Sequence, residues 1–280
     1  MTLTVFLAVL AAAVMHAGWN VLVKLKLDRF LSLFLIQTLM GVMGLAMVAV
    51  FPLAAFASLP YALASGVLHL GYNLFLARSY RTGDLSQVYP IARGGAPLLT
   101  LCVTWFAAHE QVSPLGALGV LVLTSGIWLV SLAGKKQVRL DGMTLFFALG
   151  TSVFIAAYTV VDGLGGRASG SPSSYAGLVF VFDALFLLAY GVISRGPGII
   201  ASVAPFWRMG VAGAALSVGA YWIAIWAMSR APISAVAALR ETSILFVMLL
   251  SMRVLKEKVT GWRLGGAGLI AAGAILLRLS

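Results

Sequence analysis

Long apolar runs separated by short polar gaps cover nearly the whole of this 280-residue chain. A helix that crosses a bilayer needs about 20 mostly apolar residues, and each run reaches that length. The pattern predicts an all-α integral membrane protein with ten transmembrane helices and no room for an extramembrane catalytic domain. The expected spans lie at about 3–23, 31–51, 58–78, 85–107, 114–133, 142–162, 174–194, 208–229, 233–254 and 261–279.

The composition excludes a soluble domain, because 61% of the residues are hydrophobic and only 10% are charged. The net charge of +11 does not indicate a nucleic-acid partner, because the cations gather at the connections between spans. Odd-numbered connections hold fourteen of them: Lys24, Lys26, Arg29, Arg78, Arg81, Lys135, Lys136, Arg139, Arg195, Arg208, Arg253, Lys256, Lys258 and Arg263. The even connections and the tail hold Arg167, Arg230 and Arg278. This bias predicts a multi-pass protein of the inner (plasma) membrane with both termini outward.

The two halves of the chain resemble each other. A shift of 148 residues places Arg93, in the fourth span, opposite Glu241, in the ninth. Each half has five spans, an odd number, so the halves at residues 1–137 and 138–280 are predicted to be inverted repeats. The fifth and tenth spans are rich in glycine, and after a one-residue slip Gly126 lies over Gly273. Such faces allow close helix packing within a monomer or, alternatively, a homodimer.

Charges at membrane depth cost about 2.5–3.5 kcal/mol each on insertion scales, so Arg93 and Glu241 indicate a site. Pro90, Pro97 and two glycines surround Arg93, and an interrupted span with a central charge is typical of transporter sites. Arg93 is suited to a carboxylate or phosphonate, and Glu241 to an ammonium group or a proton. The alternative is a structural ion pair between Arg93 and Glu241 or Asp183.

Other polar and aromatic residues recur at helical spacing within the spans. The predicted solute-binding residues are Arg93, Glu241, Tyr89, Trp19, Asn20, Tyr72, Asn73, Trp222 and Trp226. The candidates for proton coupling are Asp183, Glu241 and His16. Packing or an interfacial aromatic belt is the alternative for the aromatic residues. Arg240 either extends toward the interface or pairs with another helix. The sequence has no clustered metal ligands, and neither a metal nor another cofactor is expected.

The ten spans in two halves, the short loop with Glu110 before the fifth span and the glycine-rich last spans resemble the drug/metabolite transporter superfamily, in particular its EamA family of bacterial permeases. The segment His16–Asn20 with Lys24 and Asp28 also resembles a subgroup found beside phosphonate-utilisation genes. The resemblance implies secondary transport, often export of amino acids or other small metabolites, from a central cavity. Members are often drawn with cytoplasmic termini, and here we follow the charge bias instead.

The leading expectation is therefore a secondary transporter, in which Arg93 and Glu241 hold a zwitterionic solute. Its partners would be that small solute and the lipid bilayer. A flippase-like carrier of a lipid-linked headgroup is an alternative, and it would need a lateral opening. An intramembrane enzyme would need a converging acid, base and nucleophile, and no motif links the available side chains, His16, Asp183 and Glu241.

Overall fold

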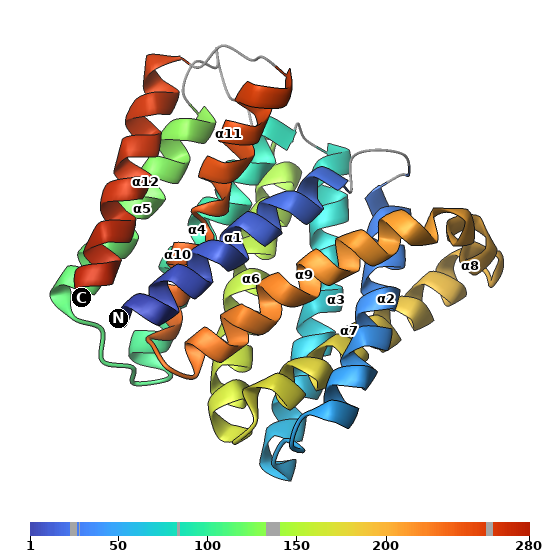
Figure 1. The fold of residues 1–280 in the computed structure, drawn as a ribbon. Helices are drawn as coiled ribbons and strands as arrows, with labels where there is room; N and C mark the ends of the chain where they lie inside the picture. The colour runs from blue at the N-terminus through green and yellow to red at the C-terminus, as the bar shows by residue number, and fades with distance from the viewer. Residues whose placement is uncertain (23–26, 28, 83–84, 133–140, 256–259) are drawn as a thin grey trace.

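The computed structural model describes residues 1–22, 27, 29–82, 85–132, 141–255 and 260–280, and within these residues the chain forms helices and no strands (Figure 1). The helices of the first half follow the predicted spans closely. They are α1 (Leu3–Leu22), α2 (Arg29–Val50), α3 (Leu59–Thr82), α4 (Leu85–Phe106) and α5 (Pro114–Leu132), with the short 3-10 helix η1 (Phe56–Ser58) before α3.

The second half contains two short additional elements and one divided span. Its elements are α6 (Gly142–Ala168), α7 (Pro172–Arg195), α8 (Gly198–Val203), η2 (Ala204–Phe206), α9 (Trp207–Met228), α10 (Ile233–Arg240), α11 (Ser243–Leu255) and α12 (Gly261–Leu279). The predicted single span at 233–254 is therefore corrected to two helices.

Seven helical segments among the described residues are long and apolar enough to cross a membrane. They are α1, α2, α5, α6, α7, α12 and a segment that runs from α8 through α9. These segments define a multi-pass membrane protein. Among the other predicted spans, α4 contains the shorter apolar segment Ile91–Phe106 within the described residues, and α10 and α11 are each short because their span is divided.

The distribution of side chains suits a lipid environment. Large apolar side chains such as Leu7, Val42 and Phe146 are exposed on the outer surface. Polar side chains such as Asn73 and Asp183 are buried inside the helix assembly. Because lipid offers no hydrogen bonds, polar groups in a membrane protein must face other protein groups or a wet cavity. The interior is therefore where a functional site is expected.

Helices of the two halves pack against each other throughout the molecule. α5 packs against α12, α2 against α7, α1 against α9 and α3 against α6. Two of these contacts are close because glycines meet: a Cβ on Gly273 would lie 2.8 Å from the Gly119 carbonyl oxygen, and one on Gly44 would lie 2.6 Å from the Gly177 carbonyl oxygen. Backbones that approach this closely are typical of membrane helix packing.

The helix breaks between α10 and α11 at Glu241. The amide N–H groups of Glu241, Thr242 and Ile244 donate to carbonyls three residues earlier instead of four. A short 3-10 stretch inside a helix satisfies the backbone while it changes the helix direction, and such stretches often mark functional hinges. The break thus places Glu241 at the joint of a divided span.

α4, in contrast, is one continuous helix, although the sequence indicated an interruption there. Its neighbours contact it closely near the prolines and glycines. The hydroxyl of Ser152 in α6 lies 2.9 Å from the Ile91 carbonyl oxygen, to which it donates. A Cβ on Gly94 would collide with the Trp128 side chain of α5. A neighbouring helix that supplies hydrogen bonds can keep a proline-containing membrane helix intact.

Both termini lie at the same end of the molecule, where the Arg278 guanidinium donates to the Met1 carbonyl at 2.6 Å (Figure 1). The connection after α2 contacts the connection after α6, where Ala55 N–H donates to the Ser169 carbonyl at 2.8 Å. Which side of the membrane this end faces stays a prediction. Many of the residues behind that prediction lie outside the described part of the chain: Lys24, Lys26, Lys135, Lys136, Arg139, Lys256 and Lys258.

Candidate functional site

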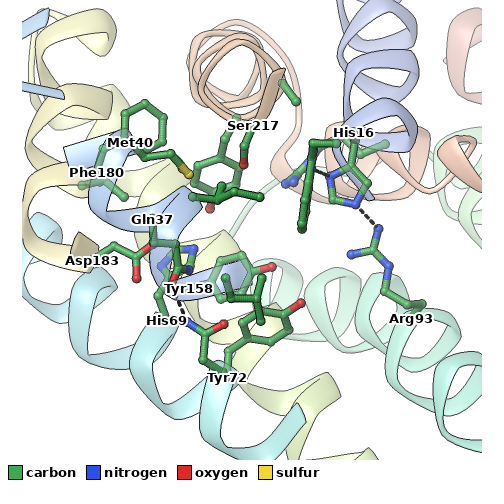
Figure 2. A pocket seen from close by; sticks show the side chains of 18 residues that line it. His16, Gln37, Met40, His69, Tyr72, Arg93, Tyr158, Phe180, Asp183 and Ser217 are labelled. Atoms are coloured by element: carbon green, nitrogen blue, oxygen red, sulfur yellow. Dashed lines mark hydrogen bonds between the residues drawn. The ribbon is translucent and has the colours of Figure 1, made fainter. Parts of the chain in front are cut away.

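A cavity lies between helices of the two halves (Figure 2). The space open to the centre of a water molecule is about 80 Å³, enough for on the order of five water molecules or a small solute. Its lining comes from α1, α2, α3, α4, α6, α7, α9 and α10. The polar and charged lining residues are His16, Gln37, His69, Asn73, Arg93, Asp183, Ser217 and Arg240; the aromatic ones are Trp19, Tyr72, Tyr158, Phe180 and Tyr221; the apolar ones are Leu33, Ile36, Met40, Val179 and Ala220.

Arg93 and His16 meet at one end of the cavity (Figure 2). Arg93 Nη2 lies 3.0 Å from His16 Nε2, and the Trp19 indole N–H lies 3.3 Å from His16 Nδ1. A neutral imidazole accepts at only one nitrogen, so His16 cannot accept from both donors at once. The shorter contact favours the bond from Arg93, which orients the imidazole against the guanidinium.

Arg93 also forms an ion pair with Glu241, and we call this contact the inner pair. Arg93 Nε lies 3.0 Å from Glu241 Oε2, although the alignment does not make a regular hydrogen bond. Both side chains are buried, and Glu241 lies behind Arg93 at the helix break rather than in the cavity wall. The opposite charges predicted to hold a zwitterion thus neutralise each other in this structure.

Aromatic rings form a continuous wall around the middle of the cavity. His69 stacks on Tyr158 with ring centroids 4.0 Å apart, and Tyr72 meets Tyr158 edge-on at 5.8 Å. Tyr221 packs edge-on against His69 at 5.6 Å. The guanidinium of Arg240, which also lines the cavity, lies 4.8 Å from the Tyr221 ring centroid. Such a wall offers apolar area and negative ring faces to a bound molecule.

Asp162, a buried carboxylate outside the cavity lining, supports this wall from behind. It accepts hydrogen bonds from the hydroxyls of Tyr175 and Tyr221, one at each oxygen. A buried carboxylate is stable when both its oxygens are hydrogen-bonded. The burial of Asp162 therefore has a structural explanation, because its carboxylate holds Tyr221, whose side chain lines the cavity.

Asp183 lies at the opposite end of the cavity from Arg93, beside Gln37 (Figure 2). Asn73 Nδ2 donates to Gln37 Oε1 at 3.3 Å. No described residue donates to Asp183 Oδ1 or to Asn73 Oδ1, although both side chains are buried. This end of the cavity therefore presents hydrogen-bond acceptors that the protein itself leaves without donors.

The structure brings six of the predicted residues into the cavity wall: His16, Trp19, Tyr72, Asn73, Arg93 and Asp183. Others lie elsewhere. Asn20 donates to the His16 carbonyl, the Trp222 indole donates to Ser173 at 2.9 Å, and Trp226 packs under the Arg230 guanidinium. Tyr89 belongs to α4, and its side chain lies outside the described part of the structure.

Several residues of the cavity wall are absent from the predicted solute-binding residues. For some of them, the sequence contains a feature that could have indicated a role. Gln37 occupies the position in the second span that corresponds roughly to Asp183 in the seventh. His69 and Tyr158 stand out as polar aromatic residues in the interior of a span. Phe180 and Ser217 carry no such signal, because an isolated Phe or Ser is common in any membrane helix.

A second ion pair lies at the end of the molecule that holds the termini, and we call it the rim pair. Arg167 Nη2 lies 2.6 Å from Glu110 Oε1, and Glu110 Oε2 accepts the Ile233 amide N–H at 2.9 Å. Arg167 also donates to the carbonyls of Met228 and Ala231. Glu110 therefore caps the N-terminus of α10, whose other end carries the inner pair.

These features define a multi-pass membrane protein with a polar cavity between its two halves. The model of the EamA-like transporter family matches residues 142–279, the second half of the chain. The chain therefore belongs to the EamA-like transporter family, within the drug/metabolite transporter superfamily, and is a membrane transporter of that type.

The comparison with solved structures agrees on the fold. A solved protein crystal structure has 18% sequence identity and a TM-score of 0.77, and the similarity covers 100% of this chain and 98% of that one. At this identity the likeness shows the fold alone. No curated protein matches the chain. The resemblance of α1 to the phosphonate-associated subgroup stays a prediction, because the family match begins at residue 142 and Lys24 and Asp28 lie outside the described residues.

Proposed function

We propose that the protein is a secondary transporter of a small polar or zwitterionic metabolite, such as an amino acid, and that it works as an exporter. The observation that carries the proposal is the polar cavity inside an otherwise apolar helix assembly, with walls from both halves of the chain. Burying so many polar groups at membrane depth is costly, so their convergence on one small space indicates a binding function.

Two inverted five-helix repeats, at residues 1–137 and 138–280, would provide the alternating access. Several packing pairs support this proposal, because exchanging the halves turns each of them into another observed pair. The contact of α1 with α9 corresponds to that of α6 with α3, and the contact of α4 with α6 corresponds to that of α10 and α11 with α1. Gly119 and Gly126 of α5 contact Gly273 and Gly266 of α12 in the same reciprocal way.

The inner pair fits this mechanism as a link between the halves. Arg93 belongs to α4 of the first half, and Glu241 to the joint of the divided span in the second. Because the joint replaces α-helical bonds by 3-10 bonds, α10 and α11 can change their mutual angle at little cost. We expect the inner pair to transmit such a change to the cavity, where Arg93 Nη2 contacts His16.

Purified protein in proteoliposomes tests the proposal directly. Vesicles preloaded with unlabelled amino acids should accumulate the corresponding labelled amino acid by counterflow. Arg93→Ala should abolish the flux, while the matched control Arg230→Ala, at the edge of the molecule beside Trp226, should retain it. Lipid scrambling without solute counterflow would contradict a solute carrier and favour a headgroup flippase. Equal flux in Arg93→Ala would remove Arg93 from the transport site.

A further inference from the structure

One end of the cavity is built from acceptors. Asp183 and Asn73 come from neighbouring helices, α7 and α3, and line the same space. Asp183 is 4% exposed and Asn73 is 5% exposed. Asp183 Oδ1 and Asn73 Oδ1 each lack a donor among the described residues, whereas Asn73 Nδ2 donates to Gln37. The two oxygens are therefore buried acceptors without a donor among the described residues, on two side chains that line the same cavity.

Such a pair is unusual in a folded protein. More than nine-tenths of buried polar groups have a hydrogen-bond partner, and each exception needs an explanation. The penalty is largest for a carboxylate, because burial of a charge without a counter-ion is more costly than burial of a neutral dipole. Asp162, the other buried carboxyl of this region, shows how the chain satisfies a structural carboxylate: two tyrosine hydroxyls donate to it. Among the described residues, none donates to Asp183 Oδ1.

The cationic side chains that line the cavity have partners elsewhere. Arg93 is at the opposite end and is already paired with Glu241. Arg240 lies over the Tyr221 ring. Near the acceptors, His69, Tyr72 and Tyr158 contribute aromatic rings to the cavity lining. Ring faces attract cations, most strongly when the cation is desolvated.

A cation that carries several N–H donors fits all of these features of the acceptor end. We infer that Asp183 and Asn73 form the subsite for a protonated amino group of the transported solute. An ammonium group supplies three donors, of which one can bind each oxygen and one can face the aromatic wall. The inference rests on the proposed function for its biological meaning, and it assigns the solute to the primary amines, including amino acids and aminophosphonates.

Binding to purified protein tests the subsite independently of transport. The probes are three molecules with the same carbon chain and different charges: propylammonium, 1-propanol and propionate, each at matched ionic strength. A ligand that binds the folded state raises the thermal midpoint in a saturable manner. We expect propylammonium to raise the midpoint of the wild type and the two other probes to leave it unchanged. Asp183→Asn should lower the apparent affinity for propylammonium by about tenfold or more.

Matched variants separate this subsite from a general effect on folding. Asp141→Asn changes a carboxyl at the start of α6, outside the cavity lining, and it should retain the propylammonium response. Asn73→Ala should weaken the response if the amide oxygen is part of the subsite. Without probe, Asp183→Asn should be at least as stable as the wild type, because it removes an unsatisfied carboxylate.

The outcomes are distinct from those of the flux assay. No saturable response to propylammonium, or an equal response in Asp183→Asn, would overturn the subsite even if the protein transports a solute. A selective response that disappears in Asp183→Asn would support the subsite, and failure of every flux assay would then count against the transporter proposal alone.

Discussion

The inner pair and the rim pair hold the two ends of the same short helix, α10, and they do so differently. At the N-terminus of α10, Glu110 accepts from both Arg167 and the Ile233 amide, and Arg167 has two further carbonyl acceptors. At the C-terminal end, Arg93 Nε lies 3.0 Å from Glu241 Oε2 without the alignment of a regular hydrogen bond, and Arg93 Nη2 contacts His16. Both partners of the rim pair thus bond to backbone groups, whereas the Nε–Oε2 contact of the inner pair lacks regular alignment.

This difference has consequences for movement. A well-satisfied network at an edge fixes a helix end, because each partner would lose several hydrogen bonds on separation. A buried pair with imperfect geometry gains less from its present arrangement and can exchange it for another at a lower cost. The rim pair is therefore the fixed end of α10, and the inner pair, at the helix joint beside the cavity, is the end able to rearrange.

The largest expected effect comes from breaking the inner pair. Arg93→Leu leaves Glu241 buried without a counter-ion and should reduce the free energy of unfolding by about 3–5 kcal/mol. The double variant Arg93→Leu/Glu241→Leu should recover most of this loss, because an apolar pair replaces two buried charges. Denaturant or thermal unfolding of the four proteins of this cycle measures the coupling.

Solute flux should not recover in the double variant. If stability and flux recovered together, the inner pair would serve the fold only. If the single variant lost no stability, the ion pair would contribute nothing in the membrane-embedded protein.

An intermediate effect is expected at the rim pair. Glu110→Ala removes the acceptor of the Ile233 amide and the counter-ion of Arg167, and should cost about 1–3 kcal/mol, less than Arg93→Leu because Arg167 is partly exposed. Glu110→Gln keeps an acceptor for Ile233 and should lose about half as much. Thermal unfolding measures both variants. A greater loss for Glu110→Ala than for Arg93→Leu would reverse the comparison.

The smallest effect is expected at Asp141, which caps α6 far from either pair. Its carboxylate accepts the Thr144 amide N–H at 3.0 Å, and hydrogen bonds from Thr144 lower the pKa of Asp141 below its ordinary value. A lowered pKa in the folded state stabilises the protein at neutral pH, and this contribution is lost as the pH falls through that lowered pKa. Asp141→Ala should therefore lower the thermal midpoint slightly at pH 7, and the difference should shrink in acid.

Thermal scans of wild type and Asp141→Ala at several pH values provide the measurement. A difference that grows as the pH falls would contradict the assigned hydrogen bond. The variant also provides a reference for the two ion pairs, because it shows how much an exposed carboxylate that does not contact α10 contributes to thermal stability.

The sequence alone predicted the fold better than the site, for physical reasons. Apolar runs report directly on membrane burial, so most helix positions follow from them. The break at Glu241 could not be predicted, because no proline or glycine causes it and its 3-10 bonds depend on tertiary contacts. The break expected at Pro90 and Pro97 is absent: α4 is one helix there, with Ser152 of α6 and Trp128 of α5 packed against it.

The candidate site shows the same limit. Repeat alignment placed Arg93 opposite Glu241 and so anticipated that they are related in space. It could not show that they neutralise each other, or that Asp183 lacks a donor, because both facts depend on side-chain directions. Trp222 and Trp226 share a helix with Tyr221, yet only Tyr221 of these three lines the cavity, which spacing along one helix cannot decide.

Access of water-soluble reagents to the cavity tests the central claim most directly. Ser217 lines the cavity, and replacing Cys102, the single cysteine of the chain, by Ser gives a background for Ser217→Cys. In oriented vesicles, we predict that a charged methanethiosulfonate reagent modifies Cys at position 217 and that a transported solute slows the reaction. Modification that is absent from both sides of the membrane, or that no solute affects, would contradict a solute cavity between the two halves.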